Sequence, residues 1–203
     1  THPKYNPENF GFDQHYGISG AGSLYAPLNK ENIIESRQTW DFADFITWQV
    51  TNYYALENGQ NIIPENSEYL TDVFTKKAVD FIKTNKNNSF FLHLSHMAPH
   101  GPFQAQKKYY DQFSHIKDHN KRVYYAMIKN LDDSIGEIKN TLKQEGIAEN
   151  TLIIFTSDNG GATYTRATDN SPYIGGKMSN FEGGTIVPMM IEWPKKIKPQ
   201  TNY

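Results

Sequence analysis

The sequence predicts an α/β fold, a mostly parallel sheet flanked by helices, and three observations support this. Residues 89–95 and 151–157 form short apolar runs that do not alternate with polar residues, a pattern typical of strands covered on both faces. A long amphipathic helix is predicted between them. A strand, a helix and a second strand make up the βαβ unit, whose two strands are parallel. We therefore expect 89–95 and 151–157 to be neighbouring parallel strands.

The elements before the first run follow from local patterns. Residues 1–39 are rich in Gly, Pro, Asn and Tyr and are predicted to be irregular. Residues 49–64 alternate around Asn58-Gly59, a dipeptide suited to a type I′ turn, and predict a hairpin. From Asn66 the apolar residues recur with helical period and predict a helix. Its apolar face contains Leu70, Val73, Phe74, Ala78, Phe81 and Ile82.

The second helix is predicted at about 120–145, where apolar residues again form one stripe. Gly146 is suited to end this helix, since glycine accepts the left-handed conformation common after a last helical turn. The apolar stretch "TIVPMMIEW", residues 185–193, predicts one more strand. We expect all of residues 1–203 to form a single α/β domain.

Composition excludes several classes of function. Lys and Arg total 20 against 22 Asp and Glu, and the net charge of −2 gives no electrostatic basis for binding nucleic acid or an anionic membrane. No apolar run reaches the length needed to span a bilayer, and no signal-peptide pattern opens the chain. The chain has no cysteine, so disulfides, thiolate metal sites and a cysteine nucleophile are excluded within it.

Polar residues follow the predicted strands. Asp158 and Asn159 come directly after the run 151–157, and they offer the carboxylate and amide oxygens that calcium prefers. His100 follows the run 89–95, and Lys177 precedes the last strand. A histidine and a lysine beside a cation would move a proton and bind an anion. The alternative is a plain turn, because Asp-Asn-Gly also suits turns, and these residues alone do not decide.

The histidines differ in their surroundings. His100 lies between Pro99 and Gly101-Pro102, in an irregular loop where a core histidine is less expected. His96 and His100 have the spacing of a helical zinc pair, but the prolines argue against a helix there. His93, within the run, is predicted to be a hydrogen-bonded core residue.

Lys177 on its own would be an ordinary surface lysine. The preceding Gly175 and Gly176 would permit close approach of the backbone to an anion.

Six segments together resemble the sulfatase family of the alkaline-phosphatase-like superfamily. They are "GFDQHYG", "YLTDVFTKKAVDFI", "FFLHLSHMAPHGPF", "LDDSIGEI", "FTSDNGG" and "GGKMSNFEGGTIVPMMIEWP". The resemblance implies an alkaline-phosphatase-like fold and the hydrolysis of a sulfuric ester, with a sulfated sugar or an aryl sulfate as substrate. It implies that Asp158 and Asn159 bind calcium, that His100 faces the ester and that Lys177 holds the sulfate. His96 is predicted as a further substrate-binding residue.

The family's nucleophile is not matched. It is a formylglycine made from Cys or Ser in the pattern Cys/Ser-x-Pro-x-Arg, and none of Arg37, Arg122 and Arg166 stands two places after a proline. We therefore expect the chain to be a central portion of a sulfatase catalytic domain, lacking the nucleophile segment and the C-terminal subdomain, with no turnover by itself. The resemblance also implies a periplasmic or secreted protein.

Two other functions stay open. The first is a phosphoryl-ester hydrolase of the same superfamily, although two-zinc phosphatases there have Asp-His where this chain has Asp158-Asn159. The second is a non-catalytic domain that binds anionic sugars.

Overall fold

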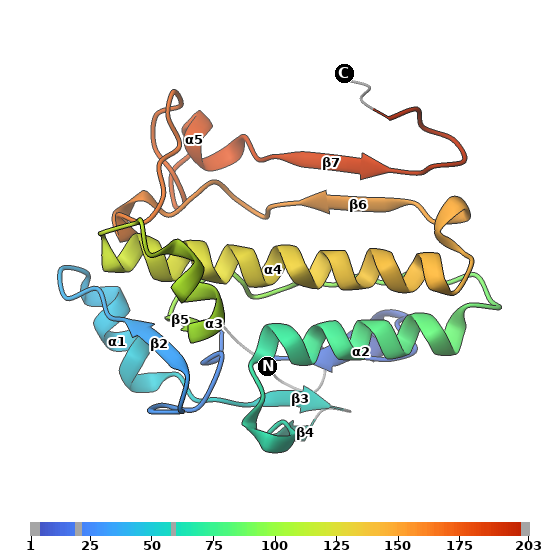
Figure 1. Ribbon diagram of the computed structural model, residues 1–203, viewed down its shortest axis with the longest axis horizontal. Helices are drawn as coiled ribbons and strands as arrows, with labels where there is room; N and C mark the ends of the chain where they lie inside the picture. Colours follow the sequence, from blue (N-terminus) through green and yellow to red (C-terminus); the bar gives the residue numbers. More distant parts are fainter. Residues whose placement is uncertain (1–4, 19–21, 58–59, 200–203) are drawn as a thin grey trace.

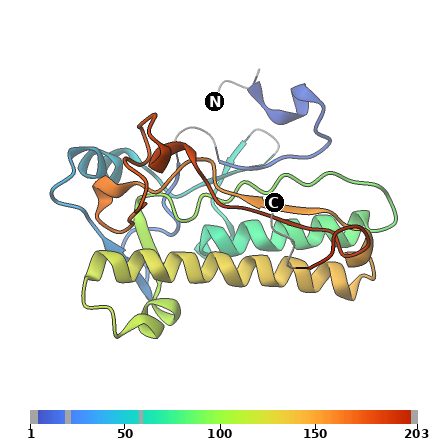
Figure 2. The same cartoon turned by 90° about the horizontal axis from the view of Figure 1, so that it is seen from above.

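The structure is a computed structural model that describes residues 5–18, 22–57 and 60–199. Two long helices, α2 (Leu70–Asn85) and α4 (His119–Gln144), lie side by side and confirm the two predicted helices (Figure 1). We call them the helix layer. On one side of them run the extended residues 89–96 and the strands β6 (Ile153–Thr156) and β7 (Met189–Glu192), which together we call the strand layer (Figure 2).

The remaining strands form two further small sheets, and every strand pair among the described residues is antiparallel. β1 (Tyr16–Gly17), β3 (Ala55–Glu57) and β4 (Gln60–Ile62) make one sheet, and β2 (Ile33–Ser36) pairs with β5 (Phe103–Gln106) in the other. The pairing of β3 with β4 confirms the predicted hairpin in its central part; its turn, Asn58-Gly59, lies outside the described residues.

The predicted neighbouring parallel strands are wrong in their pairing. Residues 151–157 contain β6, but β6 pairs with β7, antiparallel, and residues 89–95 form no ladder with any described strand. The two segments do run in the same direction, as a βαβ unit requires (Figure 1). The βαβ pattern fixes that direction because α4 returns the chain to the same end, but it does not require the two strands to be adjacent.

The short helices are α1 (Phe42–Val50), α3 (Lys107–Tyr110) and α5 (Glu182–Thr185). Single 3₁₀ turns occur at Pro7–Phe10, Glu65–Ser67, Asp111–Phe113, Ala148–Asn150 and Thr163–Thr165. Aspartates cap two helices: Asp41 accepts a hydrogen bond from the backbone N–H of Ala43 at α1, and Asp118 accepts one from that of Lys121 at α4. Local patterns did not predict the helices α1, α3 and α5 or the strands β1, β2 and β5.

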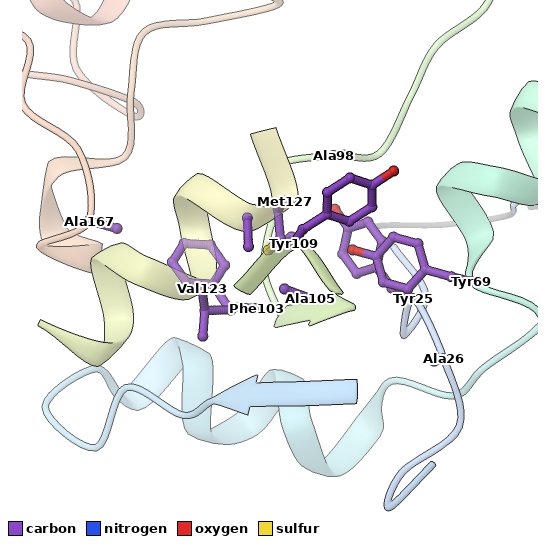
Figure 3. Packing of buried hydrophobic residues seen from close by; sticks show 11 residues of the cluster. Tyr25, Ala26, Tyr69, Ala98, Phe103, Ala105, Tyr109, Val123, Met127 and Ala167 are labelled. Atoms are coloured by element: carbon purple, nitrogen blue, oxygen red, sulfur yellow. The ribbon is translucent and has the colours of Figure 1, made fainter. Parts of the chain in front are cut away.

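The main core lies between α4, β5 and the segment around Tyr25 (Figure 3). Its side chains come from distant parts of the chain, so the core joins the N-terminal segment to the helix layer. The largest fully buried members are Tyr25, Phe103, Val123 and Met127. A second cluster, containing Leu24, Trp48, Tyr53, Ala55 and Leu70, links α1 and β3 to the start of α2.

None of the helices in the described ranges is both long and apolar enough to cross a membrane.

Candidate functional site

The turn that carries Asp158 and Asn159 directly follows β6. Asp158 is exposed and Asn159 is half-buried. The Ser157 hydroxyl donates a hydrogen bond of 2.8 Å to the backbone carbonyl of Asn159, which folds the turn back on itself. The strand therefore delivers an acid and an amide side by side at its carboxyl end, as the sequence predicts.

A set of paired glycines joins this turn to the segment that bears Lys177. The backbone N–H of Lys177 donates to the carbonyl of Gly161 at 3.1 Å, and that of Gly160 donates to the carbonyl of Gly184 at 3.0 Å. A Cβ at Gly160 would lie 1.8 Å from the Gly183 carbonyl oxygen, so only glycine fits there. We call residues 157–161 and 174–184, with these contacts, the glycine-paired loops.

The side chain of Asn170 holds the same loops together. Its amide oxygen accepts from the backbone N–H of Gly161 at 3.0 Å, and its amide nitrogen donates to the carbonyls of Gly161 at 2.9 Å and Gly175 at 3.1 Å. Gly175 itself has φ +83°, a left-handed conformation that favours glycine. One amide thus fixes the spacing between the Asp158-Asn159 turn and the residues just before Lys177.

These contacts correct the expected role of the glycines before Lys177. A Cβ on Gly176 would lie 2.5 Å from the Gly161 carbonyl oxygen, so the room that glycine provides is filled by protein backbone. The Gly175-Gly176 pair therefore positions Lys177 through loop packing. The Lys177 side chain is half-buried.

His100 lies in an irregular loop, as predicted, and its backbone is anchored to the core. Its carbonyl accepts a hydrogen bond of 2.9 Å from the hydroxyl of Tyr25, a fully buried residue. Its ring Nδ1 lies 2.7 Å from the carbonyl oxygen of Gly101. Since a carbonyl can only accept, Nδ1 carries the hydrogen, and the exposed ring has Nε2 left to take or give a proton.

His96 has different surroundings. Its Nε2 lies 3.0 Å from the hydroxyl of Ser134 on α4, and its Nδ1 is buried without a partner among the described residues. Burial lowers the pKa of His96 to about 4. The ring is therefore neutral at neutral pH and is directed toward the helix layer, so its predicted contact with substrate stays a prediction that this geometry does not favour.

The side chain of His93 is exposed, so the prediction of a core residue is wrong. Side chains in this segment alternate, and His93 falls on the side away from the helix layer.

The structure brings the segments that carry four of the predicted site residues to one end of the strand layer. The His100 loop ends the run 89–96 and the Asp158-Asn159 turn ends β6, and both segments run the same way (Figure 1). The glycine-paired loops bring Lys177 to that end as well. Within the described ranges, no hydrogen bond or ion pair joins the side chains of His100, Asp158 and Lys177 to one another.

The donor chemistry at this end fits calcium, but the number of donors is small. Asp158 and Asn159 supply a carboxylate and an amide oxygen, whereas calcium takes about six to eight oxygen ligands. Among the described residues there is no group of three or more His, Cys, Asp or Glu residues placed to bind a metal. Asp158 and Asn159 can therefore supply two of the ligands of a calcium site, and the other ligands must come from elsewhere.

Two positioning residues were missed by the sequence analysis, Tyr25 and Asn170. Tyr25 lies far from His100 in sequence and supports it through a buried hydroxyl. Asn170 lies in a segment whose composition predicts a loop and nothing more specific. Neither belongs to a local pattern, because each acts through contacts that only the folded chain creates.

Comparison with known proteins identifies relatives of the whole region. The family model described as Sulfatase matches residues 5–203. The chain is 29% identical over 201 residues to N-acetylgalactosamine-6-sulfatase of Rattus norvegicus, covering 96% of this chain and 35% of that protein. It is 34% identical over 143 residues to N-acetylgalactosamine-6-O-sulfatase of Bacteroides thetaiotaomicron, covering 65% of this chain and 27% of that protein.

A solved structure has the same fold. The crystal structure of Ps i-CgsB superposes with a TM-score of 0.80 at 32% identity, covering 97% of this chain and 43% of that one. The same protein in complex with k-i-k-neocarrahexaose gives a TM-score of 0.79. The expected fold is confirmed by this likeness. The chain spans roughly a third of the length of the curated relatives.

Proposed function

Because the chain belongs to the sulfatase family, we propose that its full-length protein hydrolyses sulfuric esters of carbohydrates, with calcium bound in part by Asp158 and Asn159. The observation that carries this proposal is the link between the Asp158-Asn159 turn and Lys177 through Gly161. That link supports the proposal because Asp158, Asn159 and Lys177 lie on loops that are hydrogen-bonded to each other. A cation bound by the first two residues and the lysine ammonium could then act on the same anionic ester.

The residues of this chain have separable roles in the proposed reaction. Lys177 pairs with the sulfate oxygens through its ammonium group. His100 holds its Nδ1 hydrogen on the Gly101 carbonyl, so a protonated Nε2 can give its proton to the leaving oxygen. Bound calcium supplies further positive charge that offsets the charge of the sulfate.

The nucleophile comes from outside residues 1–203 in this proposal. The chain contains no cysteine, and none of its arginines follows a proline by two places. The formylglycine of the family would then be supplied by another part of the full-length protein. For the same reason, residues 1–203 alone should show no turnover of an aryl sulfate, even with calcium.

A sulfated sugar is the favoured substrate over an aryl sulfate. The relatives named above are N-acetylgalactosamine-6-sulfatases, and the structural neighbour is described with a neocarrahexaose, although arylsulfatase J of Mus musculus also matches. Trp40, which is 44% exposed, donates its indole N–H to the carbonyl of Tyr164 and carries the Arg166 guanidinium over its ring at 4.7 Å. An aromatic face beside a guanidinium suits a sulfated sugar ring.

The proposed location is the periplasm or the outside of the cell, because sulfated polymers are too large and too charged to cross a membrane unaided.

The test uses the full-length protein and measures kcat/KM on a sulfated galactosamine, an aryl sulfate and an aryl phosphate. His100→Ala and Lys177→Ala should each lower kcat/KM on the preferred sulfate about 10²- to 10⁴-fold. Lys143→Ala, at the opposite end of α4, is the matched lysine control and should leave it unchanged. Asp158→Ala should raise the calcium concentration needed for activity.

Three results would contradict the proposal. Turnover of the phosphate without turnover of the sulfates would favour the phosphoryl-ester hydrolase. Binding of a sulfated oligosaccharide with no turnover of any ester would favour the non-catalytic domain. Turnover by residues 1–203 alone, abolished by a substitution within them, would place the nucleophile inside this chain.

A further inference from the structure

Two arginines stack on tryptophans at nearly the same distance but differ in their charge partners. The guanidinium of Arg37 lies 4.6 Å from the centre of the Trp48 ring, and that of Arg166 lies 4.7 Å from the centre of the Trp40 ring. Arg37 pairs with a carboxylate oxygen of Glu35 at 3.1 Å, whereas Arg166 forms no ion pair with any described residue. Trp48 is buried, but Trp40 is 44% exposed. The first pair is therefore satisfied within the protein, and the second is open to a ligand.

The backbone of Arg166 is held in a conformation that a residue with a Cβ rarely adopts. Its φ of +59° lies in the left-handed region, at the end of the 3₁₀ turn Thr163–Thr165. The turn is fixed from below, because the buried side chain of Asn120 on α4 donates to the carbonyl of Thr165 at 2.6 Å. Asn120 in turn accepts from the buried hydroxyl of Ser36 at 3.0 Å. The exposed guanidinium therefore rests on a rigid support.

This turn continues directly from the glycine-paired loops. The Gly161 carbonyl that accepts from the backbone N–H of Lys177 also accepts from that of Thr163, at 3.1 Å. Even a fully extended chain would place Arg166 no more than about 18 Å from Gly161, and the 3₁₀ turn shortens that span. Trp40 reaches the same turn through its indole N–H. In Figure 1 the segment after β6 runs to the start of α4, so the stacked pair lies within a few sugar units of the Lys177 loop.

We infer that Arg166 and Trp40 form a subsite for a second sulfate group, which the enzyme does not remove, on a sugar near the one whose ester lies at Lys177. The nature of this ligand rests on the proposed function. A guanidinium stacked on an indole keeps its N–H edge free, and that edge matches two oxygens of one sulfate. The substrate class is therefore an oligosaccharide sulfated on more than one sugar. A monosaccharide sulfate would leave the subsite empty.

A purely structural role explains the stacked pair less well. An exposed cation–π contact stabilises a protein only modestly, and the turn is already held by Asn120 and by the indole N–H of Trp40. A structural arginine would also be expected to pair with a nearby acid. Asp41, next to Trp40 in the sequence, instead accepts a hydrogen bond from the backbone of α1. The charge of Arg166 is thus left for a group from outside the protein.

Steady-state kinetics of the full-length protein test the inference with sulfated galactosamine trisaccharides. One trisaccharide carries only the ester to be cleaved, and the others carry a second sulfate on the middle or the far sugar. Arg166→Asn should raise KM for at least one doubly sulfated trisaccharide by about 10- to 100-fold, with kcat nearly unchanged. It should leave KM for the singly sulfated trisaccharide unchanged. Asparagine accepts the left-handed conformation, so the turn is kept.

Two further variants separate the free N–H edge from general charge. Arg37→Asn removes a guanidinium with the same stacking but with its own acid partner, and as the matched control it should change neither KM. Arg166→Lys keeps the charge without the planar fork and should lose affinity to an intermediate extent. An equal rise of KM for singly and doubly sulfated trisaccharides in Arg166→Asn would overturn the inference, because the loss would then be general. An unchanged KM for every doubly sulfated trisaccharide would overturn it as well.

Titration calorimetry without calcium gives a readout that does not depend on turnover. Arg166→Asn should weaken binding of the doubly sulfated trisaccharide by about 10- to 100-fold, and Arg37→Asn should not weaken it. This result in a protein that cleaves no ester would uphold the subsite and contradict the proposed hydrolysis. A trisaccharide with a uronic acid in place of the second sulfated sugar distinguishes the two anions. Tighter binding of the uronic acid, lost in Arg166→Asn, would overturn the assignment to sulfate in favour of a carboxylate.

Discussion

The helix layer and the strand layer bury their apolar residues to very different extents. Met127 on α4 is fully buried, whereas Met190 on β7 is 59% exposed, although both are methionines in regular elements with many apolar neighbours in sequence. Alternate side chains of residues 90–96 and of β6 are half-buried, whereas all four residues of β7 are exposed. An apolar pattern therefore does not by itself determine how deeply a side chain is buried.

Truncating one methionine in each layer should give very different losses of stability. In residues 1–203, Met127→Ala should lower the free energy of unfolding by about 2–5 kcal/mol, because it leaves a cavity in a packed core. Met190→Ala should change it by no more than about 0.5 kcal/mol, since that side chain already contacts water. Urea denaturation of the two variants measures both values.

Equal losses of stability in the two variants would contradict the difference in burial between the two layers. They would mean that the strand layer is covered in solution, and a dependence of the urea midpoint on protein concentration would identify self-association as the cause.

His96 sits at the junction of the two layers and should make stability depend on pH. Its pKa is lowered by burial from about 6.5 in the unfolded chain to about 4 in the folded one. Above pH 6.5 the ring is neutral in both states and contributes no pH dependence. As the pH falls from 6.5 to 4, the unfolded state takes up a proton that the folded state refuses, so the free energy of unfolding falls by about 3 kcal/mol in total.

His96→Gln isolates this contribution, because glutamine does not titrate. The difference in unfolding free energy between the parent chain and His96→Gln should shift by about 2 kcal/mol between pH 6.5 and pH 5, with the parent chain losing more. A constant difference across this range would show that the ring is hydrated and that the two layers separate easily at this point.

Local patterns in the sequence were sufficient for the elements whose packing partners lie close in sequence or on one helix face. The stripe on α4 predicted its bounds to within a residue or two, and Asn58-Gly59 predicted the pairing of β3 with β4. The helix α1 was not predicted because its apolar residues do not lie on a single face. Most of them, including Phe42, are exposed. The prediction of the partner of β6 was wrong because strand order depends on contacts between residues distant in sequence, which periodicity does not encode.

The residues of the candidate site also differ in whether a local sequence pattern reveals them. Asp158, Asn159 and Lys177 were found because motifs place them beside glycines, and His100 because prolines surround it. The residues that position them through hydrogen bonds were not predicted from the sequence. Asn170 and Tyr25 act through single hydrogen bonds to backbone groups, and any polar residue of similar size would look the same in sequence.

The glycine-paired loops and the open surface of α4 should respond in opposite ways when a glycine is replaced by alanine. Gly160→Ala places a Cβ where the Gly183 carbonyl oxygen lies 1.8 Å away, so the two loops must separate, at a cost of about 1–3 kcal/mol in residues 1–203. Gly136→Ala on α4 has nothing within 4 Å and should instead stabilise the helix by about 0.5–1 kcal/mol. The urea midpoints of the two variants, measured at one protein concentration, should therefore shift in opposite directions.

In the full-length protein Gly160→Ala should also weaken calcium and sulfate binding together, because Asp158 and Lys177 are joined through this contact. If Gly160→Ala were as harmless as Gly136→Ala, the loops would not be packed against each other, and the link between Asp158 and Lys177 that supports the proposed function would be lost.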